Sequence, residues 1–254
     1  GNFAEAIAGV TGGLLATISL RMPFYFQFAI AAIAIPAALL LKEPEVHAKE
    51  LSKSFKTIVR TIRKTFLHRE LRSAILVSSF TGTASLTFAW FVQPYFKAAD
   101  VPLSAFGILW TLLNLSVGVS SMFSYKVEKW LGQRYSLLFI ILGLAVAYLL
   151  AAWEISLAGI AILFAFYLFR GIAHPFLKDY INRYTQSEVR ATILSLRNFV
   201  IRINFAIIGP LLGFLTDEFS LGTALLTAGL SYVIVALAAA MPLLSKKSTK
   251  EISE

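Results

Sequence analysis

The sequence contains no cysteine and is poor in histidine and acidic residues. Without cysteine the chain forms no disulfide and no thiolate metal site. The histidines His47, His68 and His174 are widely separated and lack metal-ligand spacing. A glycine-rich phosphate loop with its lysine and a nucleophile elbow are also missing from the sequence. No site for catalysis or ATP use is visible, so we expect neither enzyme activity nor a cofactor.

Hydrophobic residues, in contrast, are abundant. They make up 57% of the 254 residues, and the mean hydropathy is +0.73, which exceeds what a soluble domain needs for its core. A helix needs about 20 mostly apolar residues to cross a bilayer, because only a helix satisfies its own backbone polar groups there. The sequence therefore predicts an all-α, polytopic membrane protein. The expected spans are residues 2–20, 24–41, 73–96, 105–125, 135–153, 157–180, 191–216 and 220–243.

Basic residues indicate the orientation of these spans, because Lys and Arg resist translocation whereas acidic residues matter little. Only two basic residues of the loops, Arg21 and Lys97, lie on one side of the expected membrane. Three more basic residues lie inside spans, Arg170, Arg197 and Arg202. The remaining basic residues all lie on the other side: Lys42, Lys49, Lys53, Lys56, Arg60, Arg63, Lys64, Arg69, Arg72, Lys126, Lys129, Arg134, Lys178, Arg183, Arg190, Lys246, Lys247 and Lys250. We expect this side to be cytoplasmic, in a bacterial inner membrane.

The net charge of +9 is therefore located at membrane edges rather than on one soluble face. Such a distribution favours contact with membrane lipids and does not indicate a nucleic-acid partner.

The 42–72 connection is long and predicts a domain boundary. It separates residues 1–41 from the spans at 73–243, which are followed by a tail at 244–254. Apolar residues recur in the connection at helical spacing among many basic ones, namely Leu51, Phe55, Ile58, Ile62 and Phe66. This pattern is typical of an amphipathic helix lying on an anionic membrane surface. A solvated linker held by positive charge is an equally good interpretation.

An internal repeat links the two ends of the chain. The segment Ala8-Gly9-Val10-Thr11-Gly12-Gly13 lines up with Gly209-Pro210-Leu211-Leu212-Gly213-Phe214. Each segment leads through a short external loop into the last span of its half, as in transporters built from parallel repeats. In this alignment the first span lacks its cytoplasmic part, so we expect the chain to be a fragment.

With these features the sequence resembles the major facilitator superfamily, whose members are secondary transporters with two six-helix halves. By position, the first two spans resemble helices five and six, and the later spans resemble helices seven to twelve. Residues 126–134, with the sequence KVEKWLGQR, resemble the second-half copy of the family's charged, Gly-rich loop. Arg170-Gly171 is similar to the motif arginine of a fourth helix, and 190–195 with 209–213 resemble the eleventh-helix region.

The resemblance departs from the family's antiporter pattern at one position. That signature resembles Gly-Pro-x-x-Gly-Gly, whereas residues 8–13 lack the proline. Drug or proton antiport is therefore not supported by this motif. The glycines also have a simpler interpretation, since small residues let helices pack closely in lipid.

Ionisable residues inside spans are costly in hydrocarbon and become candidates for function. Glu5 aligns with Ala206 in the repeat and is expected at mid-depth, where a raised pKa would suit it to proton coupling. Arg170 or Arg202 would supply the counter-charge, and a structural ion pair is the alternative for each. Arg197 lies nearer the cytoplasmic end and can extend toward water.

Further candidates follow from buried amides and from the resemblance, which implies that the third and sixth spans line a central cavity. An amide facing lipid would lack hydrogen bonds, whereas Tyr95 is more simply an interfacial aromatic. A histidine before a proline, such as His174, is more often structural. The candidates for substrate contact are Trp90, Gln93, Asn114, Tyr167, Arg170, His174, Arg202 and Asn204.

Charged residues near the cytoplasmic side form a second group of candidates. They surround the two connections that follow the fourth and sixth spans, where ion pairs can lock or release a gate. A solvated loop with no gating role is the alternative. The candidates are Glu128, Lys129, Arg134, Asp179, Arg183, Glu188 and Arg190.

These features together predict a transporter that moves a small solute by alternating access, coupled to an ion gradient, most simply of protons. The basic cavity residues favour an anionic or zwitterionic solute. We expect a monomer. The alternative is a polytopic protein that does not transport, either a scaffold or a membrane-embedded enzyme.

Overall fold

The computed structural model describes residues 2–40, 67–187 and 189–245, with the side chains of residues 2–6, 10, 37 and 38 excepted. The secondary structure in these ranges is helical, with no strand. Each expected span contains one helix, which confirms the all-α prediction. The helices are α1 (Asn2–Ile18), α2 (Met22–Leu39), α4 (Arg69–Ala98), α5 (Leu103–Ser121), α6 (Ser124–Trp153), α7 (Ile160–Arg183), α8 (Arg190–Glu218) and α9 (Leu221–Leu244).

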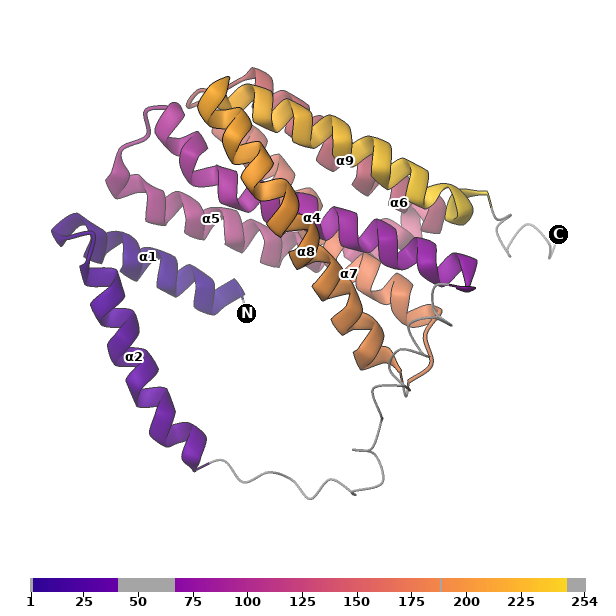
Figure 1. The fold of residues 1–254 in the computed structure, drawn as a ribbon, viewed down its shortest axis with the longest axis horizontal. Helices are drawn as coiled ribbons and strands as arrows, with labels where there is room; N and C mark the ends of the chain where they lie inside the picture. The colour runs from indigo at the N-terminus through magenta and orange to yellow at the C-terminus, as the bar shows by residue number, and fades with distance from the viewer. Residues whose placement is uncertain (1, 41–66, 188, 246–254) are drawn as a thin grey trace.

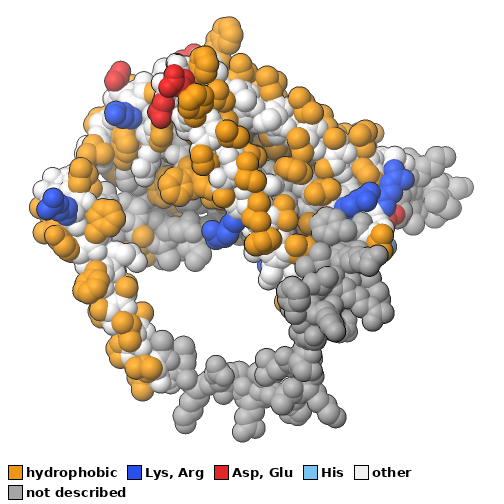
Figure 2. Space-filling view, viewed as in Figure 1, with side chains coloured by type: hydrophobic (Ala, Val, Ile, Leu, Met, Phe, Trp, Pro, Cys, Tyr) orange, Lys and Arg blue, Asp and Glu red, His pale blue; other side chains and the backbone are white. Residues whose placement is uncertain are grey.

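Six of the described helices, α4 to α9, are long and apolar enough to cross a membrane. In the two N-terminal helices the apolar segments are shorter, Ile7–Ile18 in α1 and Met22–Pro36 in α2. Hydrophobic side chains cover most of the face seen in Figure 2, and charged side chains gather mainly toward the ends of the helices. This surface matches that of a protein surrounded by lipid.

The structure differs from the expected spans at the starts of α4 and α6. Helix α6 begins at Ser124 and runs through the expected loop at 126–134, with a break at Gly132, where φ is 75° and ψ is 165°. Only glycine adopts this backbone conformation without strain. Helix α4 begins at Arg69, inside the expected connection. The expected amphipathic helix of that connection falls mainly in residues 41–66, outside the described residues.

Helix α4 lies at the centre of the bundle. It packs against α7, α8 and α9, while α6 packs against α7 and α9. Helix α5 packs against α7 on one side and α1 on the other. Figure 1 shows α1 running alongside α5, and α2 extending away from the bundle. The core therefore lies among α4, α6, α7 and α9. Helix α8 lies at the edge of this core, where it crosses over α4 (Figure 1).

Aromatic rings join the central helices at mid-bundle. The rings of Phe88 on α4 and Phe166 on α7 stack with centroids 3.7 Å apart, and Tyr148 on α6 meets Phe88 edge-on at 4.8 Å. The Tyr148 hydroxyl donates a hydrogen bond to the Ala84 carbonyl at 2.6 Å. All three rings are buried, so they fix α4 against α6 and α7.

Small residues bring α1 close to α5. A Cβ added at Gly13 would lie 3.1 Å from the Gly107 Cα, and one added at Gly9 would lie 3.0 Å from the Thr111 Oγ1. A Cβ at Gly107 would lie only 2.6 Å from the Gly9 carbonyl oxygen. The interpretation of these glycines as a close-packing surface is therefore confirmed for Gly9 and Gly13. Gly12 faces open space.

Tyr95 differs from its expected place among interfacial aromatics. Its ring is buried, and its hydroxyl donates to the backbone carbonyl of Glu154 in the connection between α6 and α7. Gly159 makes room for this contact, because a Cβ there would lie 2.0 Å from both the Glu154 oxygen and the Tyr95 hydroxyl. Tyr95 thus joins the end of α4 to a neighbouring loop instead of facing lipid.

Candidate functional site

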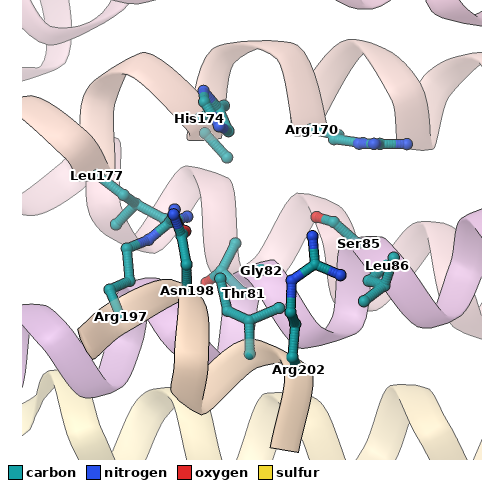
Figure 3. A pocket seen from close by; sticks show the side chains of 12 residues that line it. Thr81, Gly82, Ser85, Leu86, Arg170, His174, Leu177, Arg197, Asn198 and Arg202 are labelled. Atoms are coloured by element: carbon teal, nitrogen blue, oxygen red, sulfur yellow. Dashed lines mark hydrogen bonds between the residues drawn. The ribbon is translucent and has the colours of Figure 1, made fainter. Parts of the chain in front are cut away.

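A cavity of about 340 Å³ lies between α4, α7 and α8. Its volume is in the range of small-molecule sites. Figure 3 shows side chains from the three helices converging on it. The lining residues are Thr81, Gly82, Ser85 and Leu86 from α4, Arg170, Ala173, His174 and Leu177 from α7, and Arg197, Asn198, Ile201 and Arg202 from α8.

Helical spacing explains why these residues share one cavity. Residues three or four positions apart lie on the same face of a helix. On α7, Arg170 and His174 stand four residues apart, and on α8 the same spacing separates Arg197 from Ile201 and Asn198 from Arg202. The basic residues of α7 and α8 therefore approach the cavity from two walls.

Arg197 is buried, with 8% of its surface exposed. Its Nε donates a hydrogen bond to the Ser78 hydroxyl at 2.6 Å, and its Nη1 donates to the Asn198 side-chain oxygen at 3.1 Å. Its Nη2 lies beside Gly82, at 3.5 Å from the position a Cβ would take there. Two neutral partners therefore hold the guanidinium in place at the wall of the cavity.

Arg170 and Arg202 are the other permanent cations of the cavity. The Arg170 guanidinium carbon lies 5.2 Å from the ring centre of Tyr167, within cation–π distance. In Figure 3 Arg202 extends from α8 toward Ser85 and the Arg170 side of the cavity. The stacking partly orients Arg170 at the wall of the cavity.

The cavity has no acidic residue among the residues that line it. Ion pairs found within the described ranges involve His68, Glu70, Glu128, Asp179 and Arg183, all outside the cavity. The described residues also contain no cluster of His, Asp and Glu that could hold a metal ion. The cavity lining is therefore positively charged, and no described carboxylate among the lining residues compensates that charge.

The structure brings together three of the expected substrate residues, Arg170, His174 and Arg202. Tyr167 lies just outside, beneath the guanidinium of Arg170. Asn204 also lies outside the lining, with its amide nitrogen 3.5 Å from the Thr83 hydroxyl.

The other three expected residues lie elsewhere. Trp90 is exposed, with its ring 5.8 Å from that of Phe205. Gln93 lines a separate depression at one end of the bundle. Asn114 is buried, and its amide donates to the Trp110 carbonyl one turn earlier at 2.9 Å, which satisfies it within its own helix.

Arg197 lines the cavity, although the sequence does not place it among the candidates for substrate contact. Its position toward one end of the span suggested a side chain that reaches water, whereas the structure buries it against Ser78. The repeated spacing of polar residues at 197, 198 and 202 is the signal that could have placed it on the cavity face. For Glu5, the backbone belongs to α1 and the side chain lies outside the described residues.

Two comparisons with known proteins show which family the chain belongs to. Residues 1–209 match the family model described as Major Facilitator Superfamily. The chain belongs to the Major Facilitator Superfamily. It is also 21% identical over 249 residues to a protein described as "Uncharacterized MFS-type transporter YxaM" from Bacillus subtilis (strain 168). That alignment covers 94% of this chain and 60% of the relative, so the chain spans about three-fifths of the relative's length.

Membership of the Major Facilitator Superfamily makes the chain part of an integral membrane protein in a family of transporters. The resemblance implied that the third and sixth spans line a cavity. These spans correspond to α4 and α7, and both contribute to the lining.

The charged segment that resembles the family's Gly-rich loop makes ion pairs in the structure. Arg183, at the end of α7, donates from Nη1 and Nη2 to the two carboxylate oxygens of Glu128 at 2.7 and 2.9 Å. It also donates from Nε to Asp179 at 2.7 Å. Glu128 belongs to the part of α6 before Gly132, so this cluster fastens that short segment to α7.

The remaining gate candidates are not part of this cluster. Lys129 is exposed, and Arg134 and Arg190 are half-buried. The Nη2 of Arg134 and the Nε of Arg190 are buried and have no hydrogen-bond partner within the described ranges. Glu188 lies outside the described residues. Of the seven gate candidates, the structure therefore brings Glu128, Asp179 and Arg183 together in one cluster.

Proposed function

We propose that this chain forms part of a secondary transporter that moves a small solute across a membrane by alternating access. The observation that carries the proposal is the polar cavity between α4, α7 and α8 in a membrane-spanning bundle. Basic residues in a span are costly and are retained where a polar pathway or ligand needs them. Alternating access would expose this cavity to each side of the membrane in turn.

The proposed orientation places the Glu128, Asp179 and Arg183 cluster on the cytoplasmic side of a bacterial inner membrane. The excess of Lys and Arg in the loops of that side supports it. In this orientation the cluster would hold the segment of α6 before Gly132 against α7 while the cytoplasmic end is closed. Breaking the bidentate contact to Arg183 would favour opening.

Alternating access predicts that a cavity residue reacts with reagents from both sides of the membrane. Ser85 lines the cavity, and this chain contains no cysteine, so a Ser85→Cys thiol is unique within it. We expect a membrane-impermeant thiol reagent to modify it in both right-side-out and inside-out vesicles of the intact transporter. Modification is measured by the mass of the labelled peptide.

The matched control is Ser79→Cys on the same helix. Ser79 is fully buried and lies outside the cavity lining, so we expect no labelling from either side. If Ser85→Cys reacts from one side only under every condition, including after solute addition, alternating access at this cavity is contradicted.

Proton coupling through Glu5 stays a prediction of the sequence. A carboxyl group at mid-depth can bind a proton on one side and release it on the other. We therefore expect Glu5→Gln to abolish the dependence of transport on a proton gradient while leaving membrane insertion intact. Transport into vesicles with imposed pH gradients measures this, and an unchanged pH dependence in the variant rules out the role.

A further inference from the structure

We infer that the solute of this cavity is a small organic dianion, with one acidic group bound at the Arg197 end and the other at the Arg170 and Arg202 end. The inference rests on the proposed function, because it names the class of solute that the transporter would carry. It goes further by assigning each cation to one end of the ligand.

The first argument is charge. Three arginines and one histidine line the cavity, and the lining residues include no carboxylate. Cations in a membrane-spanning segment are costly, and they face a polar cavity or pair with other groups there. The described residues supply no counter-charge at this cavity, so an anionic ligand is the group that fits it.

The second argument concerns the Arg197 end. Asn198 and Ser78 hold this guanidinium through Nη1 and Nε. Both partners are neutral, so they orient the group without cancelling its charge. The Nη2 lies beside Gly82, over which the Ile201 side chain packs, and Arg197, Gly82 and Ile201 all line the cavity. A fixed guanidinium is pre-organised to bind carboxylate or phosphate oxygens.

The third argument concerns the opposite end. Figure 3 shows Arg202 pointing toward Ser85 and Arg170, away from Arg197 and Asn198. Arg170 is oriented by stacking on the Tyr167 ring at 5.2 Å. Together these two arginines present several donors to a second acidic group. The cavity thus has two separate cationic ends.

Size links the two ends to one ligand. A cavity of about 340 Å³ accommodates a small organic molecule but not a bulky amphiphile. Leu86 and Ile201, which also line it, provide apolar contact for a short carbon chain. These features together favour a short dicarboxylate, or a similar solute with two anionic groups, over a monoanion or a cation.

The test compares ligands of matched size on the purified intact transporter. Succinate carries two anionic groups on a four-carbon chain, butyrate carries one, and putrescine carries two positive groups. Inorganic phosphate serves as a compact anion that reaches only one end. We expect succinate, or the longer adipate, to raise the unfolding temperature and to bind about tenfold or more tightly than butyrate, because a second charge-assisted contact is made.

Arg202→Gln is expected to remove this preference, so that the dicarboxylates bind no better than butyrate. The control is Arg72→Gln, an exposed arginine at the start of α4 outside the cavity, which keeps the preference. Protection of the Ser85→Cys thiol by succinate or adipate, but not by putrescine, gives a second measurement in a protein that retains all three arginines.

Three results would overturn the inference. They are an equal or stronger effect of putrescine, no effect of either dicarboxylate, or phosphate binding as tightly as the dicarboxylates. Each is separate from a failure of the proposed function. If Ser85→Cys is labelled from both sides but dianions neither stabilise nor protect, the transporter proposal stands and the solute class is wrong.

Discussion

Gly171→Ala is expected to destabilise the bundle, although alanine is the better helix former. A Cβ at Gly171 would lie 1.9 Å from the Ser120 Oγ, 2.6 Å from the Val117 carbonyl oxygen and 3.0 Å from the Val117 Cα. The serine can rotate away, but the Val117 backbone cannot, so α5 and α7 must separate. Helix propensity favours the change by about 1 kcal/mol, and overpacking opposes it by about 1 to 3 kcal/mol or more.

We therefore expect a net loss of about 1 kcal/mol or more in the free energy of unfolding, measured by SDS titration of the intact transporter in mixed micelles. Gly213→Ala is the matched control, because nothing lies within 4 Å of a Cβ there. It is expected to be neutral or slightly stabilising. Equal effects of the two substitutions would mean that α5 and α7 do not approach closely at Gly171.

Arg197→Met is expected to separate stability from ligand binding. Arg197 is buried with neutral partners, so its removal leaves no unpaired opposite charge behind. Replacing a buried charge by an apolar side chain of similar volume is often neutral or stabilising. The Ser78 hydroxyl loses one hydrogen bond, at a cost of about 1 kcal/mol, and the Asn198 oxygen loses another that water replaces because Asn198 is exposed. The free energy of unfolding should stay within about 1 kcal/mol of the unchanged protein.

Binding should respond very differently. Losing one cation that contacts a buried anion costs about 2 kcal/mol or more, which corresponds to a fall in dianion affinity of roughly 30-fold. Titration calorimetry with succinate or adipate measures the affinity, and the same SDS titration measures stability. Arg21→Met, in the exposed turn between α1 and α2, should change neither. A loss of stability of 3 kcal/mol or more, with binding retained, would show that Arg197 is structural.

Much of the fold follows from length and hydropathy alone. Each expected span contains one helix, because the requirement for internally satisfied backbone groups leaves little alternative in lipid. The misplaced boundaries have local causes. The charged residues 126–134 predict a loop, yet they are helical up to Gly132, whose positive φ then breaks the helix. Hydropathy does not distinguish a polar helical turn from a loop.

The lining of the candidate site is predictable from the sequence where charge stands out against an apolar background. Few charged residues lie inside spans, which singles out Arg170 and Arg202, and both line the cavity. Arg197 was underrated because depth along a span does not reveal which face of the helix is buried, and that depends on how α8 crosses α4. For Asn114 the sequence predicts an amide that faces the cavity, whereas the structure shows this amide donating to the Trp110 carbonyl of its own helix.

Solute counterflow tests the central claim, transport through the cavity between α4, α7 and α8, most directly. Liposomes containing the intact transporter are loaded with the unlabelled dicarboxylate that stabilises it most, and entry of the same labelled dicarboxylate is followed without any ion gradient. Alternating access predicts a transient accumulation of label inside, and we expect Arg202→Gln to abolish it. Entry no faster than into protein-free liposomes, although the dicarboxylate binds, would contradict transport through this cavity.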